Sequence, residues 1–447
     1  MVKHLVPLTC LLAGLGFAGQ VAGTDTEPTD FSPPPEEQQL PQKMHSAMEV
    51  QPHIKVGLTD ADLLGRDNRA LQAAVDYVAG LGGGVVEIGP GEYLMRDALH
   101  LRSFVSVRGT PGQTVLRKSA GASSALALDG DFGEEQITLR NPSGFEIGDG
   151  VAMLASNVNY FAITVARITG RKGNTFSLDR PLNEDCLIRH GALAATSFPV
   201  ISGIQVEGVR LEHLIVEGRK EQNLLLDGCR SGGIFLYRGH RTVIEQCTVR
   251  NYNGDGISFQ QCNDVTLTGC VSEDNAAIGF HAGSGSQRPV MRECAARNNG
   301  EDGLFFCWRV RHGVFENNLL EANGRFGVSL GHKDTDNVLR HNVVRNNRYE
   351  GVRFRNETLG MAPHRNRLED NVIENNGTNG TGFGIRVLGE TRDLILKNNS
   401  IRDTRPQGSQ CQTVGIQVDE KVGTLTIEGN SITATTPLED RRKPVAR

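Results

Sequence analysis

The sequence predicts an all-β solenoid, a right-handed parallel β-helix with an N-terminal capping helix and a small β-rich insertion. The main observation is one recurring phrase, a glycine followed by an apolar residue, any residue and a second apolar residue. From Gly233 to Gly351 the successive glycines of this phrase stand 23 or 24 residues apart. Such a fixed step is typical of repeat proteins. The phrase begins at Gly233, Gly256, Gly279, Gly303, Gly327, Gly351, Gly384 and Gly415.

A second series keeps the same step. Cys247, Cys270 and Cys294 each precede a short strand-like run, and asparagines continue the series. Two series that advance together indicate one structural unit per step, and a unit this small must stack on its neighbours to bury its apolar face. We expect coils about 4.8 Å apart, with these residues forming one ladder of small buried side chains. The asparagines are Asn318, Asn342, Asn371, Asn399 and Asn430.

The segment before the repeats has helical periodicity. After Asp67, apolar residues recur at Leu71, Ala74, Val75 and Val78, and glycines end the pattern. An Asp start and a Gly stop are typical helix boundaries. Because the open end of a β-helix exposes strand edges that invite aggregation, we expect this helix to cover it.

These N-terminal residues carry a resemblance to a known family. Asp67–Gln72, the stretch Gly82–Tyr93 and the later coils resemble the pectate-lyase-like β-helix superfamily, including its rhamnogalacturonase- and epimerase-type N-terminal segments. The resemblance covers nearly all of residues 59–433. It implies the fold and leaves the reaction open, because members include lyases, hydrolases, epimerases, transferases and non-enzymatic phage spikes.

The N-terminus predicts export. Lys3 precedes a mostly apolar run from Leu5 to Ala18, which is typical of a signal peptide and too short to predict a membrane span. We therefore expect a secreted or periplasmic protein. The expected parts are a signal peptide (1–23), a disordered linker (24–55), the cap and first coils (56–135), the insertion (136–195), the repeats (196–433) and a polar tail (434–447).

Composition narrows the range of partners. A net charge of −5 argues against a general nucleic-acid binder. Removal of Cys10 with the signal peptide would leave eight of the nine cysteines, an even number that permits disulfides. The cysteine ladder lacks histidine or acidic ligands at suitable spacing, so no metal site is predicted there. A Ca²⁺ bridge through Asp302, Asp334 or Asp336 is left open.

One outward strip of the coils carries the expected chemistry. In the repeated phrase both apolar residues point inward and the residue between them points outward. Ionisable side chains and the single tryptophan occur at three kinds of position on this strip. They are the outward column, the residue before each glycine and the turn after each strand. Residues 301–365 contain ten Lys and Arg against eight Asp and Glu, which favours an anionic partner. The candidate residues are Asp255, His281, Asp302, Trp308, Arg309, His332, Lys333, Glu350, Arg353 and Arg355.

The first hypothesis is a polysaccharide lyase that cleaves a uronic-acid polymer by β-elimination. This reaction needs a base for the C5 proton and cations for the carboxylate. Lys333 would be the base, with His332 or His281 as substitutes and Asp302 as a further catalytic candidate. Arg309, Arg353 and Arg355 would bind the carboxylate, since guanidinium groups bind it bidentately. Trp308 would stack on a sugar, and Asp255 and Glu350 would complete the binding site.

Two alternatives stay open. An inverting glycoside hydrolase needs two carboxylates several ångströms apart, and Asp255 and Asp302, two coils apart, would be separated by about 9.6 Å. The polygalacturonase and alginate-epimerase motifs are missing, however. The other alternative is a non-catalytic β-helix that binds glycans or builds an envelope layer.

Overall fold

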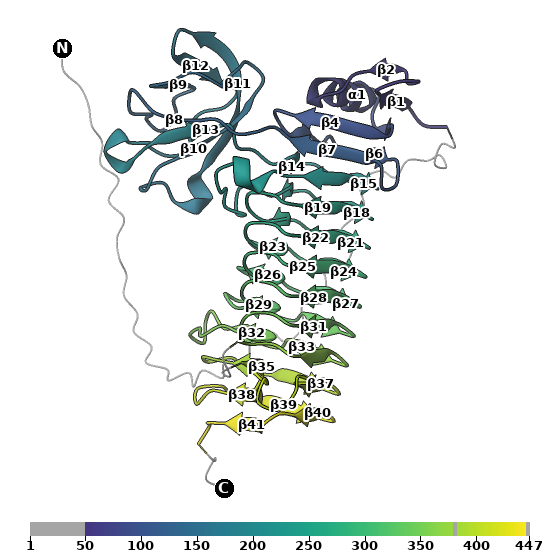
Figure 1. The fold of residues 1–447 in the computed structure, drawn as a ribbon, viewed down its shortest axis with the longest axis vertical. Helices are drawn as coiled ribbons and strands as arrows, with labels where there is room; N and C mark the ends of the chain where they lie inside the picture. The colour runs from purple at the N-terminus through teal and green to yellow at the C-terminus, as the bar shows by residue number, and fades with distance from the viewer. Residues whose placement is uncertain (1–49, 379–381, 444–447) are drawn as a thin grey trace, which may run out of the picture. The chain divides into compact units, whose positions relative to one another are not determined.

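In the computed structural model, which describes residues 50–378 and 382–443, three long parallel sheets form the walls of a β-helix (Figure 1). The predicted signal peptide, and the predicted linker up to residue 49, lie outside the described residues. Strand–crossover–strand connections between parallel strands are right-handed in almost all proteins. The described part contains no helix long and apolar enough to cross a membrane.

The first sheet has 13 strands. In spatial order they are β2 (Leu63–Leu64), β1 (His53–Gly57), β3 (Gly84–Ile88), β6 (Val105–Gly109), β15 (Arg210–Glu212), β18 (Val243–Glu245), β21 (Thr266–Thr268), β24 (Val290–Arg292), β27 (Val314–Glu316), β30 (Val338–Arg340), β33 (Arg367–Glu369), β36 (Leu394–Lys397) and β39 (Leu425–Glu428). Strand β1 begins at His53, inside the range predicted as linker.

The second sheet has 11 strands. They are β4 (Gly91–Met95), β7 (Thr114–Lys118), β16 (Ile215–Glu217), β19 (Thr248–Arg250), β22 (Val271–Glu273), β25 (Ala295–Arg297), β28 (Leu319–Glu321), β31 (Val343–Arg345), β34 (Val372–Glu374), β37 (Ser400–Arg402) and β40 (Ser431–Thr433).

The third sheet, also of 11 strands, contains the repeated glycine phrase. Its strands are β5 (Leu99–His100), β14 (Ile201–Ile204), β17 (Ile234–Tyr237), β20 (Ile257–Gln260), β23 (Phe280–Gly283), β26 (Leu304–Cys307), β29 (Val328–Leu330), β32 (Val352–Phe354), β35 (Phe383–Val387), β38 (Val414–Val418) and β41 (Thr436–Asp440). Strand β41 lies in the range predicted as a polar tail and adds one more strand to this sheet.

The apolar residues of the phrase point into the coils, as predicted. In β26, for example, Leu304 and Phe306 are 1% and 0% exposed. Parallel pairing aligns equivalent positions one above another, so that Leu304 pairs with Phe280 in the coil before and with Val328 in the coil after. Each coil therefore contributes the same positions to one continuous apolar core.

The predicted ladder is present. Asn342 donates its Nδ2 hydrogens to Asn371 Oδ1 at 3.0 Å and to the carbonyl of Phe315 at 2.9 Å, and its own Oδ1 accepts from Asn318. At the upper end, the backbone N–H of Cys294 donates to Asn318 Oδ1 at 2.9 Å. Repeating these bonds from coil to coil satisfies the amide groups, which would otherwise be costly to bury.

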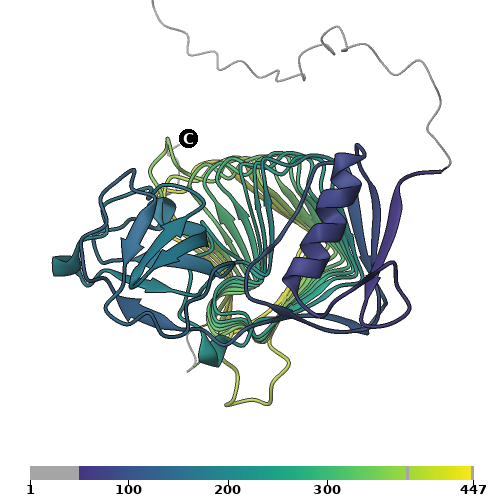
Figure 2. The same ribbon diagram turned by 90° about the horizontal axis from the view of Figure 1, so that it is seen from above.

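Helix α1 (Asn68–Gly80) covers the first coil, as predicted (Figure 2). The side chain of Asp67 caps it by accepting from the backbone N–H of Arg69. Its buried face consists of Leu71, Ala74, Val75 and Val78, the residues expected from the periodicity, together with Asn68.

The predicted insertion is a six-stranded antiparallel sheet with its own small core. It begins earlier than residue 136, because β8 belongs to it. The strands, in spatial order, are β8 (Ser123–Ala125), β13 (Leu193–Ala195), β10 (Gly150–Leu154), β11 (Thr164–Lys172), β12 (Thr175–Leu178) and β9 (Gln136–Thr138). Three short 3-10 helices complete the described elements, η1 (Tyr160–Ala162), η2 (Ile188–His190) and η3 (Lys220–Gln222).

Candidate functional site

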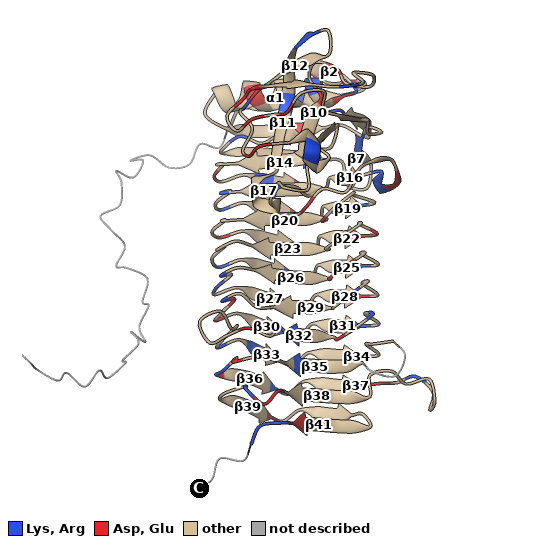
Figure 3. Ribbon diagram, turned by 90° about the vertical axis from the view of Figure 1, so that its left-hand side faces the viewer, with Lys and Arg blue, Asp and Glu red and all other residues tan. Residues whose placement is uncertain are grey.

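The candidate residues lie on the outer face of the third sheet, which Figure 3 views directly. Strand pairing aligns the outward column predicted from the sequence: His281 pairs with Phe305, Ser329 with Arg353, and Arg353 with Arg386. The upper and lower ends of this column differ. His281 is 3% exposed, whereas the side chains of Arg353 and Arg386 are 28% and 29% exposed.

The lower coils form a groove of about 500 Å³ on this face. Three arginines and one glutamate line it, so its ionisable side chains carry a net charge of plus two. Three aromatic rings complete its walls. We call it the arginine groove, and its charged and aromatic lining residues are Phe326, Arg348, Tyr349, Glu350, Arg353, Phe383 and Arg386.

Glu350 holds the two central arginines of the groove in place. Its Oε1 accepts from Nη1 of Arg353 at 3.1 Å and from Nη1 of Arg386 at 3.0 Å, and its side chain is 6% exposed. Each guanidinium also lies over an aromatic ring, Arg353 over Phe326 at 4.9 Å and Arg386 over Phe383 at 4.5 Å. Two fixed cations share one enclosed carboxylate, which leaves positive charge available to a ligand.

A second group of candidates lies in the turns that follow the strands, at the opposite strand ends from the groove. The rings of Trp308 and His332 stack at 5.0 Å, and Nε2 of His332 lies 3.0 Å from Oε1 of Glu357. Arg355 is mostly buried and pairs with Asp334 at 3.3 Å. Burial raises the pKa of the Asp334 carboxyl to about 7, against the attraction of Arg355.

Arg309 and Lys333 belong to the same turns. The Arg309 guanidinium lies 5.7 Å from the centre of the Trp308 ring. The backbone N–H of Lys333 donates to the carbonyl of Met361 at 2.6 Å, and its side chain is half-buried. The groove lies at the start of β29 and β32 and these turns follow their ends, so the predicted strip divides into two groups at opposite ends of the strands.

The upper candidates are enclosed. Residues 218–233, between β16 and β17, pass over the outer face, and the carbonyl of Gly228 accepts from Ser258 Oγ at 2.6 Å. Beneath this segment Oδ2 of Asp255 lies 2.7 Å from Nδ1 of His281. Burial would lower the pKa of His281, but Asp255 and Cys307 raise it to about 10.

Asp302 is also enclosed, with an exposure of 0%. Its Oδ1 accepts from the backbone N–H of Phe326 at 3.2 Å, and its Oδ2 has no hydrogen-bond partner among the described residues. Burial raises its pKa to about 6. Asp255 is 2% exposed, so a glycan cannot reach either carboxylate of the hydrolase alternative in this structure.

Sequence reasoning missed the aromatic part of the groove. Phe326 and Phe383 stand directly before Gly327 and Gly384, the same position in the repeat that Asp255, Asp302 and Glu350 occupy. Asp255, Asp302 and Glu350 are marked by their charge, whereas Phe326 and Phe383 resemble the apolar residues of the repeat. The sequence places Arg386 in the outward column, but it does not predict the contact between Arg386 and Glu350.

Comparisons with known proteins agree with the architecture. A family model described as a right handed beta helix region matches residues 202–359, and no curated protein matches the chain. The A-module of the Azotobacter vinelandii mannuronan C-5 epimerase AlgE4 is 17% identical with a TM-score of 0.55, covering 87% of this chain and 100% of that one. The AlgE6 A-module from the same organism is 16% identical with a TM-score of 0.51, covering 85% and 96%. These findings confirm the predicted fold.

Proposed function

Because the chain has the fold of the right-handed parallel β-helix superfamily, we propose that it binds an acidic polysaccharide on the outer face of its third sheet. The observation that carries the proposal is the arginine groove, where Arg353 and Arg386 are fixed between Glu350 and two aromatic rings. A guanidinium group binds a carboxylate through two parallel hydrogen bonds. Tyr349, which is 43% exposed at the groove, adds a flat aromatic ring that suits the apolar face of a sugar.

The position of the groove also favours a polymer. It lies at the start of β29, β32 and β35, and the turns that contain Trp308 and Lys333 follow the ends of β26 and β29 in the same sheet. A glycan that crosses the sheet would place one uronate on the arginines and a neighbouring sugar beside Trp308. The two similar modules are named for an epimerase of mannuronan, which makes mannuronan one polymer to test.

For the reaction, we propose β-elimination. Positive charge beside the carboxylate stabilises the enolate-like transition state of this reaction. Glu350, the one carboxylate among the groove-lining residues, is bonded to both arginines and is therefore poorly suited to act as a general acid. The base must lie beside C5 of the same uronate whose carboxylate contacts the arginines, so Tyr349, which is 43% exposed at the groove, is the proposed base there. Lys333 is the proposed base only for a uronate bound in the turns, where Arg309 would contact its carboxylate.

The test combines binding with product analysis. The purified chain is incubated with polymannuronate, polygalacturonate and a neutral glucan, and binding is measured by calorimetry. Ultraviolet absorbance by an unsaturated uronate would support the lyase. New reducing ends without that absorbance would show a hydrolase and not a lyase. Altered sugar stereochemistry in an intact polymer would show an epimerase. Binding without any product would leave a glycan-binding protein, and no binding to either uronate polymer would overturn the whole proposal.

A further inference from the structure

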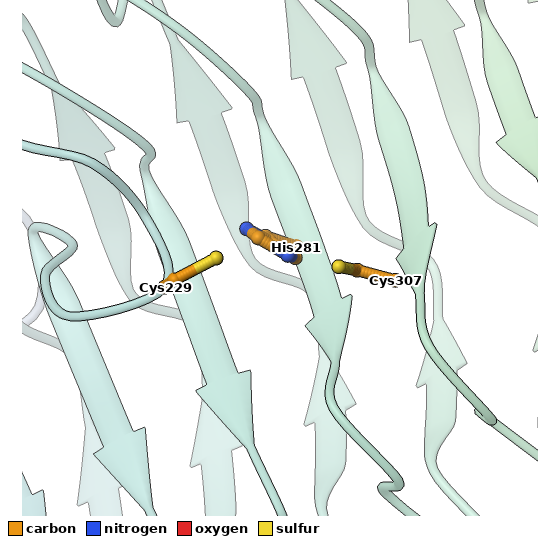
Figure 4. A group of neighbouring side chains, drawn as sticks. All are labelled: Cys229, His281 and Cys307. Atoms are coloured by element: carbon orange, nitrogen blue, oxygen red, sulfur yellow. The ribbon is translucent and has the colours of Figure 1, made fainter. Parts of the chain in front are cut away.

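Three potential metal ligands meet beneath residues 218–233, outside the arginine groove (Figure 4). Cys229 belongs to this covering segment, His281 to β23 and Cys307 to the end of β26. One ligand atom from each lies within 4.8 Å of the others, and all three residues are buried. The sequence did not predict this group, because Cys229 lies in a segment without a repeat pattern.

The histidine is oriented for a ligand by its neighbour. Nδ1 of His281 is engaged by Asp255 Oδ2 at 2.7 Å. Nε2, the other ring nitrogen, is buried and has no hydrogen-bond partner among the described residues. A carboxylate on the far nitrogen is the usual partner of a metal-bound histidine, because it fixes the tautomer and the ring orientation.

The covering segment packs closely against Asp255 and His281. A Cβ atom on Gly228 would lie 2.4 Å from Cγ of Asp255 and 2.8 Å from Nδ1 of His281, so a side chain larger than that of glycine cannot be accommodated without movement. The segment is further tied to the coil below by the N–H of Leu226, which donates to the carbonyl of Asn253 at 2.9 Å. The close approach of Gly228 brings Cys229 to the other two ligands.

We propose that Cys229, His281 and Cys307 bind a Zn²⁺ ion, with Asp255 as the positioning residue for His281. Two thiolates and a neutral imidazole are a common zinc ligand set, at about 2.3 Å for sulfur and 2.0–2.1 Å for nitrogen. A modest contraction of the cluster reaches those distances. Water takes the fourth position. The ion ties the covering segment to β23 and β26, two strands of the third sheet.

Binding requires loss of the thiol protons and competes with oxidation. Zn²⁺ takes the cysteines as thiolates and the histidine through an unprotonated Nε2, so the protons that these three groups carry are released to solvent as it binds. The same two sulfurs could instead form a disulfide in an oxidising compartment. The structure contains both as free thiols. A Cys229–Cys307 disulfide is therefore the competing outcome of the test.

The experiment measures metal directly on the full chain. The protein is isolated with thiols blocked at lysis in one portion for peptide mapping, and under reducing conditions in another for metal titration. We expect one Co²⁺ per chain, with thiolate-to-cobalt charge-transfer absorption, and displacement by Zn²⁺. Cys229→Ser and Cys307→Ser should abolish the signal, and Cys411→Ser, which removes a thiol outside the cluster, should retain it.

A proteolysis readout separates a structural metal from adventitious binding. Lys220 and Arg230 offer trypsin sites in or beside the covering segment. Chelation should increase cleavage there by about tenfold, because a segment that has lost one anchor opens more often. No metal uptake by the reduced chain, uptake unchanged in Cys229→Ser, or a Cys229–Cys307 disulfide in the blocked portion would each overturn the proposal. Because these measurements involve no glycan, they are independent of the arginine groove.

Discussion

Oδ2 of Asp255 lies 2.7 Å from Nδ1 of His281, and both side chains are enclosed beneath the segment that contains Cys229. This pair was expected to take part in glycan chemistry. Its burial and its neighbours instead assign it to the proposed zinc site.

The first prediction concerns this pair. Asp255→Asn removes the charge but keeps a side chain of the same shape, so the thiolates and the imidazole remain. We expect Co²⁺ affinity to fall about 10–100-fold, the usual effect of removing an outer partner of a metal-bound histidine. The thiolate-to-cobalt absorption should persist at saturation. Disappearance of that absorption would indicate that Asp255 maintains the fold of the site instead of orienting the histidine.

The second prediction concerns the arginine groove. Arg386→Ala and Arg353→Ala should each weaken binding of a uronate polymer about 10–100-fold, since a charge-assisted hydrogen bond contributes about 1.5–3 kcal/mol. Lysine at either position should restore only part of the affinity, because it lacks the planar fork. Calorimetric titration measures these effects.

Arg345→Ala is the matched control for the groove. Arg345 lies in β31 of the second sheet, where it pairs with Glu321 at 2.8 Å. Loss of one exposed ion pair of this kind changes stability little, and binding should be unchanged. Equal losses in all three variants would show that affinity depends on total charge and that the groove is not the site.

The repeat was predictable because its signals lie within a few residues of one another in the sequence. A glycine phrase and a Cys/Asn series with the same step indicate coils, and stacking then places Asn318, Asn342 and Asn371 one above another. The capping helix was equally visible, since Leu71, Ala74, Val75 and Val78 share one helical face. These features depend on local periodicity, which one sequence contains in full.

The site could be predicted only in part. Register placed His281, Lys333 and Arg353 on one sheet face, but exposure on that face depends on residues 218–233, which fold back over it without any periodic signal. Glu350 and Arg386 meet because one lies in the turn and the other on the strand of the next coil. Side-chain pairing of that kind depends on rotamers, which the repeat pattern does not specify.

The third prediction is a change in pH dependence on replacing Asp302. Burial raises its pKa from 3.8 to about 6 in the folded chain. Between these values the folded state binds more protons than the unfolded state, so the contribution of this carboxyl to stability is present at low pH and is lost as the pH rises through about 6. Over about two pH units the contribution amounts to at most about 3 kcal/mol.

Asp302→Asn removes this titration. Compared with the wild type, the variant should therefore become relatively more stable on going from about pH 4 to about pH 7.5. Urea unfolding at the two pH values measures the difference. Asp264→Asn is the control, because it makes the same chemical change at a carboxyl that is 44% exposed and pairs with Arg288 at the surface. If the difference in unfolding free energy between Asp302→Asn and the wild type were the same at both pH values, the assignment of a raised pKa to Asp302 would be contradicted.

The last prediction concerns the asparagine ladder. Asn342→Ala leaves Asn318 Nδ2 without its acceptor at 2.9 Å, and it removes the donor to the carbonyl of Phe315. Each buried polar group left unpaired costs about 1–3 kcal/mol, so we expect a loss of about 2–5 kcal/mol in the free energy of unfolding. Chemical denaturation measures it. Tyr77→Ala, which truncates a side chain 57% exposed on helix α1, should change stability by less than about 0.5 kcal/mol. If Asn342→Ala were equally mild, the stacked amides would contribute register to the coils but little stability.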